Sequence, residues 1–128
     1  MRYKGWALTP QAREMVLGQF PAIMEDVRCE HVTLDLFGDD DETPPDPAAI
    51  RAYGSLSWDG YQILAVTVDG KLTQPRKDRF FHVTISKRAG LPSSQSGIIL
   101  KECVRHIIPC RPFMLLTVPF NRQLGDAV

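Results

Sequence analysis

The chain has 128 residues, of which 44% are hydrophobic and 23% are charged. This length and composition are those of one globular domain with a sizeable core, and we expect a single domain over residues 1–128. The 15 basic and 15 acidic residues cancel to a formal net charge of zero. This balance excludes the broad basic surface that grips a long nucleic acid, and it favours a small ligand or a chain end.

The cysteines and the absence of a long apolar run bear on the compartment. The three cysteines are odd in number and lack Cys-x-x-Cys spacing, so we expect a reducing compartment, no disulfide framework and no structural zinc. The first residues lead directly into a strand-like run rather than a signal peptide, and no segment is long enough to span a membrane. We therefore expect a cytoplasmic protein without a membrane partner.

The first elements are a strand, a helix and a second strand. Residues 3–8 are typical of a strand. Thr9 is a good N-cap and Pro10 suits the first position of a helix. Pro21 ends that helix. Residues 28–37 then form the second expected strand.

A loop and a hairpin follow. Residues 38–47 form the clearest loop of the chain, and their acidic run lacks the glycine and the terminal glutamate of a calcium loop, which favours a solvated loop. Residues 49–58 and 61–68 are predicted to pair as a hairpin. Asp59 and Gly60 between them are the signal for a two-residue type I′ turn.

The last part of the chain mixes strands with one short helix. A basic linker over residues 71–79 leads into a strand at 80–86. A serine-rich turn precedes a short helix at 98–104. Residues 110–118 are predicted as a proline-containing edge strand, and the segment from residue 121 as a frayed tail.

A His-Val-Thr sequence followed by an aliphatic residue occurs twice, at His31–Thr33 and at His82–Thr84. Side chains alternate between the two faces of a strand. The apolar neighbours of each motif therefore face the core, while the imidazole and the hydroxyl of each motif share the other face. The duplication predicts a pseudo-symmetric pair of strands facing one cleft.

Such a pair suits phosphodiester chemistry. One imidazole takes the proton from a nucleophile while the other protonates the leaving oxygen, and an ordinary histidine pKa near 6.5 permits both roles. The hydroxyls of Thr33 and Thr84 can donate to the non-bridging phosphoryl oxygens as charge develops. This scheme needs neither a metal nor a cofactor.

Two other interpretations of the motifs remain open. The histidines could ligate a metal with Asp35, which is the only carboxylate on the same face of its strand. Asp35 could instead orient His31 or raise its pKa. Both histidines could also be ordinary hydrogen-bonded residues at the edge of a core.

The paired motifs resemble those of the two-histidine (2H) phosphoesterase superfamily, with a closer likeness to a small phage-encoded branch. The likeness covers roughly residues 3–104. It rests on the two motifs and on the following segments: Tyr3-Lys4-Gly5, Phe37-Gly38 after the first motif, and Pro92-Ser93-Ser94-Gln95 before the apolar Ile98-Ile99-Leu100.

The resemblance implies an α+β fold of two small pseudo-symmetric antiparallel lobes across a central cleft, with helices outside. It implies that His31 and His82 are the catalytic pair and that Thr33 and Thr84 hold the phosphate. Members of the superfamily open 2′,3′-cyclic phosphates or cleave small nucleotide linkages without metal, and the phage branch destroys cyclic oligonucleotide signals of bacterial defence.

We therefore expect a metal-independent phosphodiesterase that cleaves cyclic nucleotides or cyclic oligonucleotides in immune evasion by a phage. The alternatives are an RNA-end 2′,3′-cyclic phosphodiesterase and a module that binds a nucleotide without turnover. Further substrate contacts are expected from aromatic rings that stack on bases, from a basic residue and from a serine in a phosphate cradle. These candidates are Tyr3, Trp58, Lys87 and Ser94.

Overall fold

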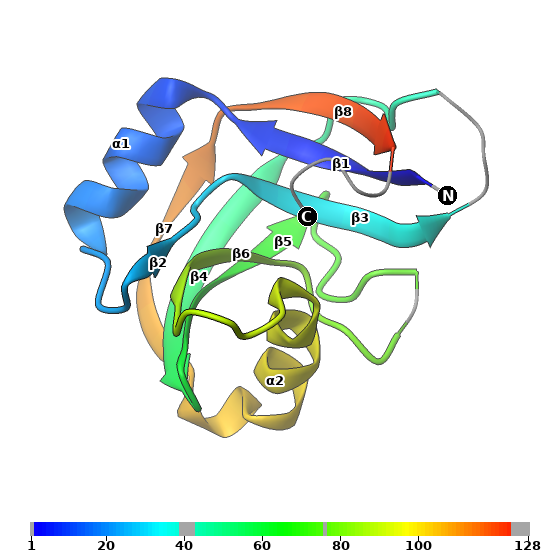
Figure 1. Ribbon diagram of the computed structural model, residues 1–128. Helices are drawn as coiled ribbons and strands as arrows, with labels where there is room; N and C mark the ends of the chain where they lie inside the picture. Colours follow the sequence, from blue (N-terminus) through cyan, green and yellow to red (C-terminus); the bar gives the residue numbers. More distant parts are fainter. Residues whose placement is uncertain (1, 39–42, 76, 124–128) are drawn as a thin grey trace.

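Two antiparallel sheets and two short helices make up the computed structural model, which describes residues 2–38, 43–75 and 77–123 (Figure 1). The three-stranded sheet has the order β3 (His31–Gly38), β1 (Arg2–Leu8), β8 (Thr117–Gln123). The five-stranded sheet has the order β2 (Asp26–Val27), β6 (His82–Lys87), β5 (Tyr61–Val68), β4 (Ile50–Trp58), β7 (Ile108–Leu115). The helices are α1 (Pro10–Gln19) and α2 (Ser96–Glu102), and single 3-10 turns lie at Ser93–Gln95 and Val104–His106. The predicted α+β class is confirmed.

The helix start and the hairpin turn that the local sequence predicts are both present. The Thr9 side chain accepts a hydrogen bond from the Ala12 N–H at 3.2 Å, and Pro10 occupies the first turn of α1. Asp59 and Gly60 both have positive φ angles, 54° and 86°, between β4 and β5. These angles are those of a type I′ turn, so the predicted hairpin is confirmed.

The five-stranded sheet buries side chains on both of its faces. On one face, Val83 of β6 and Leu64 of β5 join the main core together with Val32 of β3 and Trp6 of β1. The other face of β5 lies in a second cluster, which includes Leu100 of α2. The expected division of the motif strands is confirmed at Val32 and Val83, which are both fully buried.

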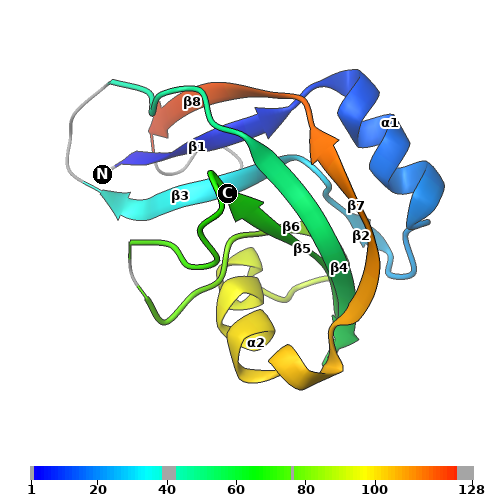
Figure 2. The same ribbon diagram turned by 180° about the vertical axis from the view of Figure 1, so that it is seen from behind.

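The strand expected at 80–86 is His82–Lys87, and the helix expected at 98–104 is Ser96–Glu102. Two further strand predictions are wrong for a reason that the structure shows. The strand expected from residue 28 begins at His31, because Cys29 has a positive φ of 57° and the chain leaves one sheet for the other there. The single strand expected over 110–118 is two strands in different sheets, as the view from behind shows (Figure 2). The chain passes from β7 to β8 at Leu116, and β8 pairs with β1 up to Gln123, so residues 121–123 are not a frayed tail.

The two sheets differ in size, with three and five strands. The pseudo-symmetric pair of lobes therefore remains an expectation from the repeated motif. The edge position predicted for the proline-containing strand is confirmed, because β7 lies at the end of the larger sheet. Residues 39–42 of the acidic run and the side chain of Asp35 lie outside the described part of the chain. No helix among the described residues is both long and apolar enough to cross a membrane.

Candidate active site

A pocket lies where the two sheets meet, and both repeated motifs line it. His31 and Thr33 come from β3, and His82 and Thr84 come from β6. The pocket is partly open to solvent. Its other lining residues are Tyr3, Arg28, Glu30, Gln74, Arg79, Ser93 and Ser94. The structure thus brings the four predicted catalytic residues together.

The segment before β3 carries the first motif across to the second. The Arg28 N–H donates to the Ile85 carbonyl at 2.9 Å, and the Cys29 N–H donates to the Thr84 carbonyl at 2.8 Å. This short extension of the β2–β6 pairing ends at Cys29, and His31 is the first residue of β3 two positions later. The backbone of the second motif is therefore the support that places the first motif at the pocket.

Gly5 lets β1 approach β3 closely beside the pocket. It pairs with Thr33, and a Cβ at this position would lie 2.0 Å from the carbonyl oxygen of Val32. No side chain fits in that space. The glycine of the Tyr-x-Gly sequence thus has a structural reason, which is to hold the strand of the first motif against β1.

The His31 imidazole lies among aromatic rings. The ring of Phe120 is 5.4 Å away in an edge arrangement, and the ring of Tyr3 is 5.9 Å away. The Nδ1 atom of His31 is buried and has no hydrogen-bond partner in the part of the chain that is described. Burial, followed by the nearby charges of His82 and two arginines, lowers the pKa of His31 to about 4. With this pKa, His31 is neutral at pH 7.

The His82 imidazole is held by polar and backbone contacts. Its Nδ1 lies 2.9 Å from the Phe80 carbonyl oxygen, and because a carbonyl only accepts, Nδ1 carries the proton and Nε2 is the acceptor of the neutral ring. Gly97 packs against the ring, since a Cβ there would lie 3.1 Å from Cε1. Burial lowers the pKa of His82, the Phe80 carbonyl opposes that shift, and Arg79 adds to it.

The two threonine hydroxyls differ as the two imidazoles do: the first has no hydrogen-bond partner and the second has one. Thr33 is half-buried, and its hydroxyl has no hydrogen-bond partner among the described residues. The Thr84 hydroxyl donates to the hydroxyl of Ser96, which is fully buried, at 2.8 Å. Hydroxyl protons rotate, so Ser96 can donate to Thr84 when Thr84 donates to a ligand. Both hydroxyls are therefore placed to serve an anion in the pocket.

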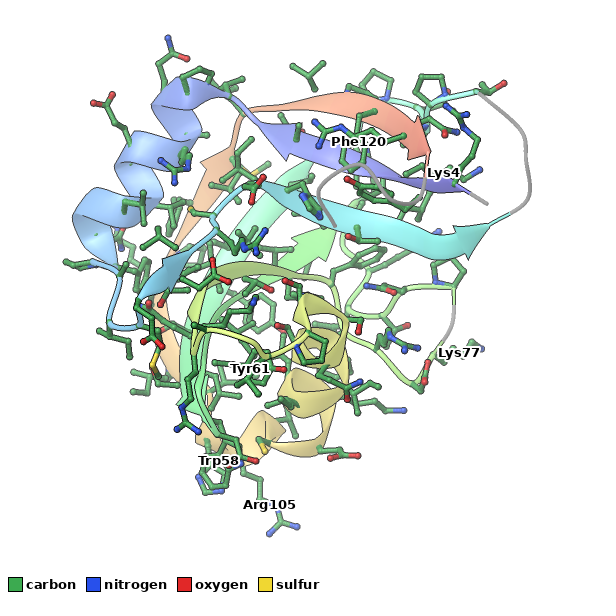
Figure 3. The ribbon with its side chains drawn as sticks, viewed as in Figure 1. Lys4, Trp58, Tyr61, Lys77, Arg105 and Phe120 are labelled. Carbon is green, nitrogen blue, oxygen red and sulfur yellow. The ribbon has the colours of Figure 1, made fainter. Side chains whose placement is uncertain are left out.

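Two of the four additional candidates lie in the pocket. Tyr3, which is 1% exposed, and Ser94, in the 3-10 turn before α2, both line it. Trp58 is at the far end of the β4–β5 hairpin, stacked on His106 at 4.7 Å and 42% exposed (Figure 3). Lys87 is buried and does not line the pocket. Substrate binding by Trp58 and Lys87 stays a prediction that the geometry of this pocket does not support.

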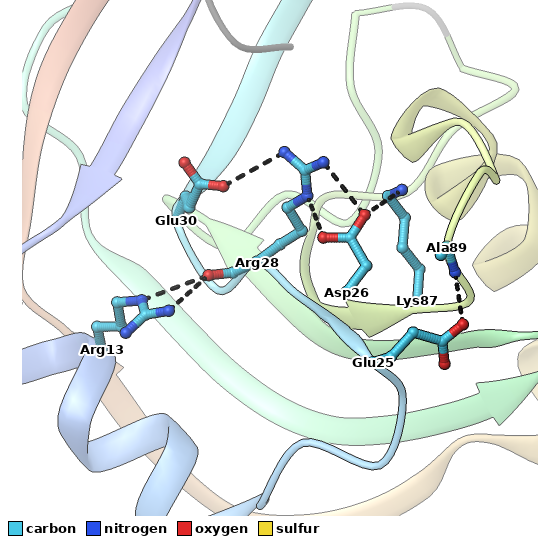
Figure 4. A network of polar contacts seen from close by, with 7 residues as sticks. All are labelled: Arg13, Glu25, Asp26, Arg28, Glu30, Lys87 and Ala89. Carbon is cyan, nitrogen blue, oxygen red and sulfur yellow. Dashed lines mark hydrogen bonds and ion pairs between the residues drawn. The ribbon is translucent and has the colours of Figure 1, made fainter.

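Lys87 belongs to a network of charges beside the pocket (Figure 4). Its Nζ donates to Asp26 at 2.7 Å, and Arg28 Nε donates to the same carboxylate at 3.0 Å. Lys87 and then Arg28 lower the pKa of the Asp26 carboxyl. Arg28 also pairs with Glu30 at 3.7 Å. The network fixes the segment that leads from β2 to β3, and it leaves the guanidinium of Arg28 between two carboxylates.

Sequence reasoning missed four polar residues of the pocket. Arg28 and Glu30 directly precede the first motif, and Gln74 and Arg79 lie in the segment that was predicted only as a basic linker. The nearness of Arg28 and Glu30 to a motif strand was the only signal for the first two. Within the described residues, no group of three or more His, Cys, Asp or Glu side chains is placed to hold a metal ion.

Comparisons of the chain with protein-family models, with curated proteins and with solved structures find no match in any of the three.

Proposed function

We propose that this protein is a metal-independent phosphodiesterase that cleaves cyclic nucleotides, with His31 and His82 as its acid–base pair. The observation that carries the proposal is the convergence of both His-Val-Thr motifs on one pocket from two different sheets. Ordinary hydrogen-bonded histidines at a core edge have no reason to meet, each with a threonine, around one space. The same convergence supports membership of the two-histidine superfamily and its two-lobed plan.

The chemistry follows from the positions of the four side chains. In a 3′–5′ linkage, the ribose 2′-hydroxyl attacks the phosphorus, and one imidazole accepts its proton. The other imidazole protonates the departing 5′-oxygen, and a 2′,3′-cyclic phosphate results. Water then opens the cyclic phosphate with the two proton transfers reversed. The hydroxyls of Thr33 and Thr84 donate to the non-bridging oxygens, where negative charge increases in the transition state.

The lowered histidine pKa values fit this cycle once a substrate is bound. The pKa of His31 is about 4 and that of His82 is also below its usual value. A phosphodiester carries a negative charge, and an anion close to an imidazole raises its pKa. Substrate binding therefore supplies the protonated histidine that the reaction needs as its acid, while the other histidine remains a neutral base.

A small cyclic oligonucleotide is the substrate class that we favour. The chain has no net positive charge that would attract a long polyanion. The resemblance to the phage branch indicates destruction of a defence signal in the host cytoplasm. Tyr3 and Ser94 at the pocket are the candidates for contacts to the base or the phosphate.

The test is turnover of a panel of substrates in EDTA, followed by chromatography. The panel holds cyclic di- and trinucleotides of both linkage types, 2′,3′-cyclic mononucleotides and an RNA that ends in a cyclic phosphate. We expect a cyclic oligonucleotide to be cleaved, and we expect this cleavage to persist in EDTA. Cleavage of the RNA end and the mononucleotides alone identifies an RNA-processing enzyme instead. Tight binding without turnover of any member identifies a sequestering module and contradicts the enzyme.

A further inference from the structure

Residues 73–75 and 77–80 lie beside His82. Thr73 and Phe80 pair as an antiparallel bridge, and the Gln74 N–H donates to the Arg79 carbonyl at 3.0 Å. The Phe80 carbonyl oxygen lies 2.9 Å from His82 Nδ1. The backbones of Gln74 and Arg79 thus meet beside the residue that orients the second histidine, and both residues line the pocket.

Arg79 stands next to His82 across a glycine. A Cβ at Gly97 would lie 3.1 Å from Arg79 Cβ and 3.1 Å from His82 Cε1. The Phe80 N–H donates to the Gly97 carbonyl at 3.2 Å, which fixes the residues just before β6 against α2. The charge of Arg79 is close enough to lower the pKa of His82. The guanidinium is therefore an electrostatic neighbour of the reacting histidine.

The two arginines that line the pocket differ in how far their charge is neutralised. Arg28 donates to Asp26 through Nε and Nη2 and pairs with Glu30 through Nη1. Arg79 donates only through Nη1, to Asp78, whose side chain is 57% exposed. An ion pair with such an exposed carboxylate is weak. Nε and Nη2 of Arg79 have no hydrogen-bond partner among the described residues.

Gln74 is the uncharged partner in this arrangement. It is 4% exposed, and its side-chain amide makes no hydrogen bond to any part of the chain that the structure describes. The amide does not belong to the buried polar atoms that lack a partner, so it is accessible to solvent or to a ligand. Because Gln74 lines the pocket of the two motifs, its amide is available to a ligand there.

We propose that Arg79 and Gln74 form an anion-binding pair that holds a non-bridging oxygen of the phosphoryl group at the His82 side of the pocket. This inference rests on the proposed function for the identity of the reacting group, a phosphodiester. Arg79 supplies a charge-assisted donor fork, which suits planar recognition of phosphate oxygens. Gln74 supplies an amide N–H. Together with Thr33 and Thr84, the pair supplies hydrogen-bond donors for the negatively charged phosphoryl oxygens, and these donors come from both sheets.

The test is a titration of the protein with inorganic phosphate, followed by NMR at the Cε1–H signals of His31 and His82. The variants are Arg79→Gln, Arg79→Lys and Gln74→Ala. Lys77→Gln is the matched control, because it removes a positive charge from the same part of the chain at an exposed residue that does not line the pocket (Figure 3). Thermal unfolding of each variant checks that it folds. If Arg79→Gln does not fold, Arg79→Lys takes its place in the test.

We expect phosphate to shift the histidine signals of the wild type. Arg79→Gln weakens phosphate binding about 10- to 100-fold, as the loss of a charge-assisted hydrogen bond does. Arg79→Lys weakens it less, and Gln74→Ala weakens it by about threefold to tenfold. Lys77→Gln leaves it unchanged. Arg79→Gln also raises the pKa of His82, because the neighbouring positive charge that lowers it is gone.

Three results overturn the pair. They are equal phosphate binding by wild type and Arg79→Gln, an equal loss in Lys77→Gln, and no phosphate binding by the wild type. In each case the proposed phosphodiesterase activity is tested separately, by turnover of the substrate panel with the wild-type protein. An active enzyme with an unaffected Arg79→Gln variant retains the proposed function and loses only the anion-binding pair.

Discussion

The two His-Val-Thr motifs have the same sequence and opposite surroundings. His82 has a carbonyl partner at Nδ1 and a glycine against its ring, and Thr84 has a hydroxyl partner. His31 lies between the rings of Tyr3 and Phe120 with its Nδ1 unsatisfied. One motif is held by hydrogen bonds, and the other by apolar packing.

This difference between the two histidines means that His31 is unfavourable for stability, whereas His82 contributes to it. A buried polar atom without a partner costs free energy, and natural proteins keep such atoms mainly where function uses them. His31 is such a residue, and the structure around it favours an apolar ring. His82 satisfies the fold and the pocket at once. Substitutions at the two positions should therefore have opposite effects on stability and the same effect on activity.

The largest expected effect is on stability at His82. His82→Phe removes the N–H that the Phe80 carbonyl accepts and presses a larger ring on Gly97, so the free energy of unfolding should fall by about 3 kcal/mol. His31→Phe removes an unsatisfied nitrogen from an aromatic environment and should raise it by about 1 kcal/mol. Urea unfolding of both variants measures the two changes. Equal losses in both variants contradict the comparison.

The threonines should lose activity alike and stability differently. Thr33→Val and Thr84→Val each remove one donor to the phosphoryl oxygens, and kcat should fall about 100-fold in both. Thr84→Val also leaves the buried Ser96 hydroxyl without its partner and should lose about 1 kcal/mol of unfolding free energy. Thr33→Val should keep the wild-type stability. A Thr84→Val enzyme that turns over at the wild-type rate contradicts the role of this hydroxyl.

Stability should fall as the pH drops below 6.5. The pKa of His31 is about 4 in the folded protein and near 6.5 in the unfolded chain. Between these values the unfolded state binds more protons, so acid lowers the free energy of unfolding, by an amount on the order of 2 kcal/mol. His82 acts in the same direction. Unfolding curves from pH 7 to pH 4 should be flatter for His31→Phe than for wild type, and identical slopes count against a buried neutral His31.

Trp58 should give the smallest effect. It stacks on His106 at the far end of the β4–β5 hairpin and does not line the pocket. Trp58→Ala should leave kcat/KM for the cleaved substrate unchanged, while Tyr3→Ala, which removes a ring from the pocket, lowers it. Steady-state kinetics of the two variants decide this. A loss in Trp58→Ala that equals the loss in Tyr3→Ala places substrate on the hairpin.

The sequence carries enough local information to predict most elements and the two motifs that meet at the pocket. Alternation along the motif strands placed Val32 and Val83 in the core, and the Asp59-Gly60 turn defined the hairpin. The two points where the chain changes sheets were missed, because the positive φ of Cys29 and the break at Leu116 depend on which sheet the chain joins next. Such choices are made by tertiary packing rather than by local propensity.

The residues that support the motifs were beyond prediction for a similar reason. Ser96, Gly97 and Phe80 contact the second motif only because α2 and the residues just before β6 pack against that strand. Phe120 reaches His31 from the opposite end of the chain. Spacing in the sequence identifies a motif, but it does not reveal which distant segment packs on it.

The most direct test of the paired motifs is the rate of substrate cleavage by four enzymes: wild type, His31→Ala, His82→Ala and the double variant. If the two histidines act as one acid–base pair, each single substitution should lower kcat by about 1,000-fold. The double variant should then be no slower than the slower single variant, because the groups act as a unit. Wild-type turnover by either single variant, or multiplied losses in the double variant, would contradict an acid–base pair.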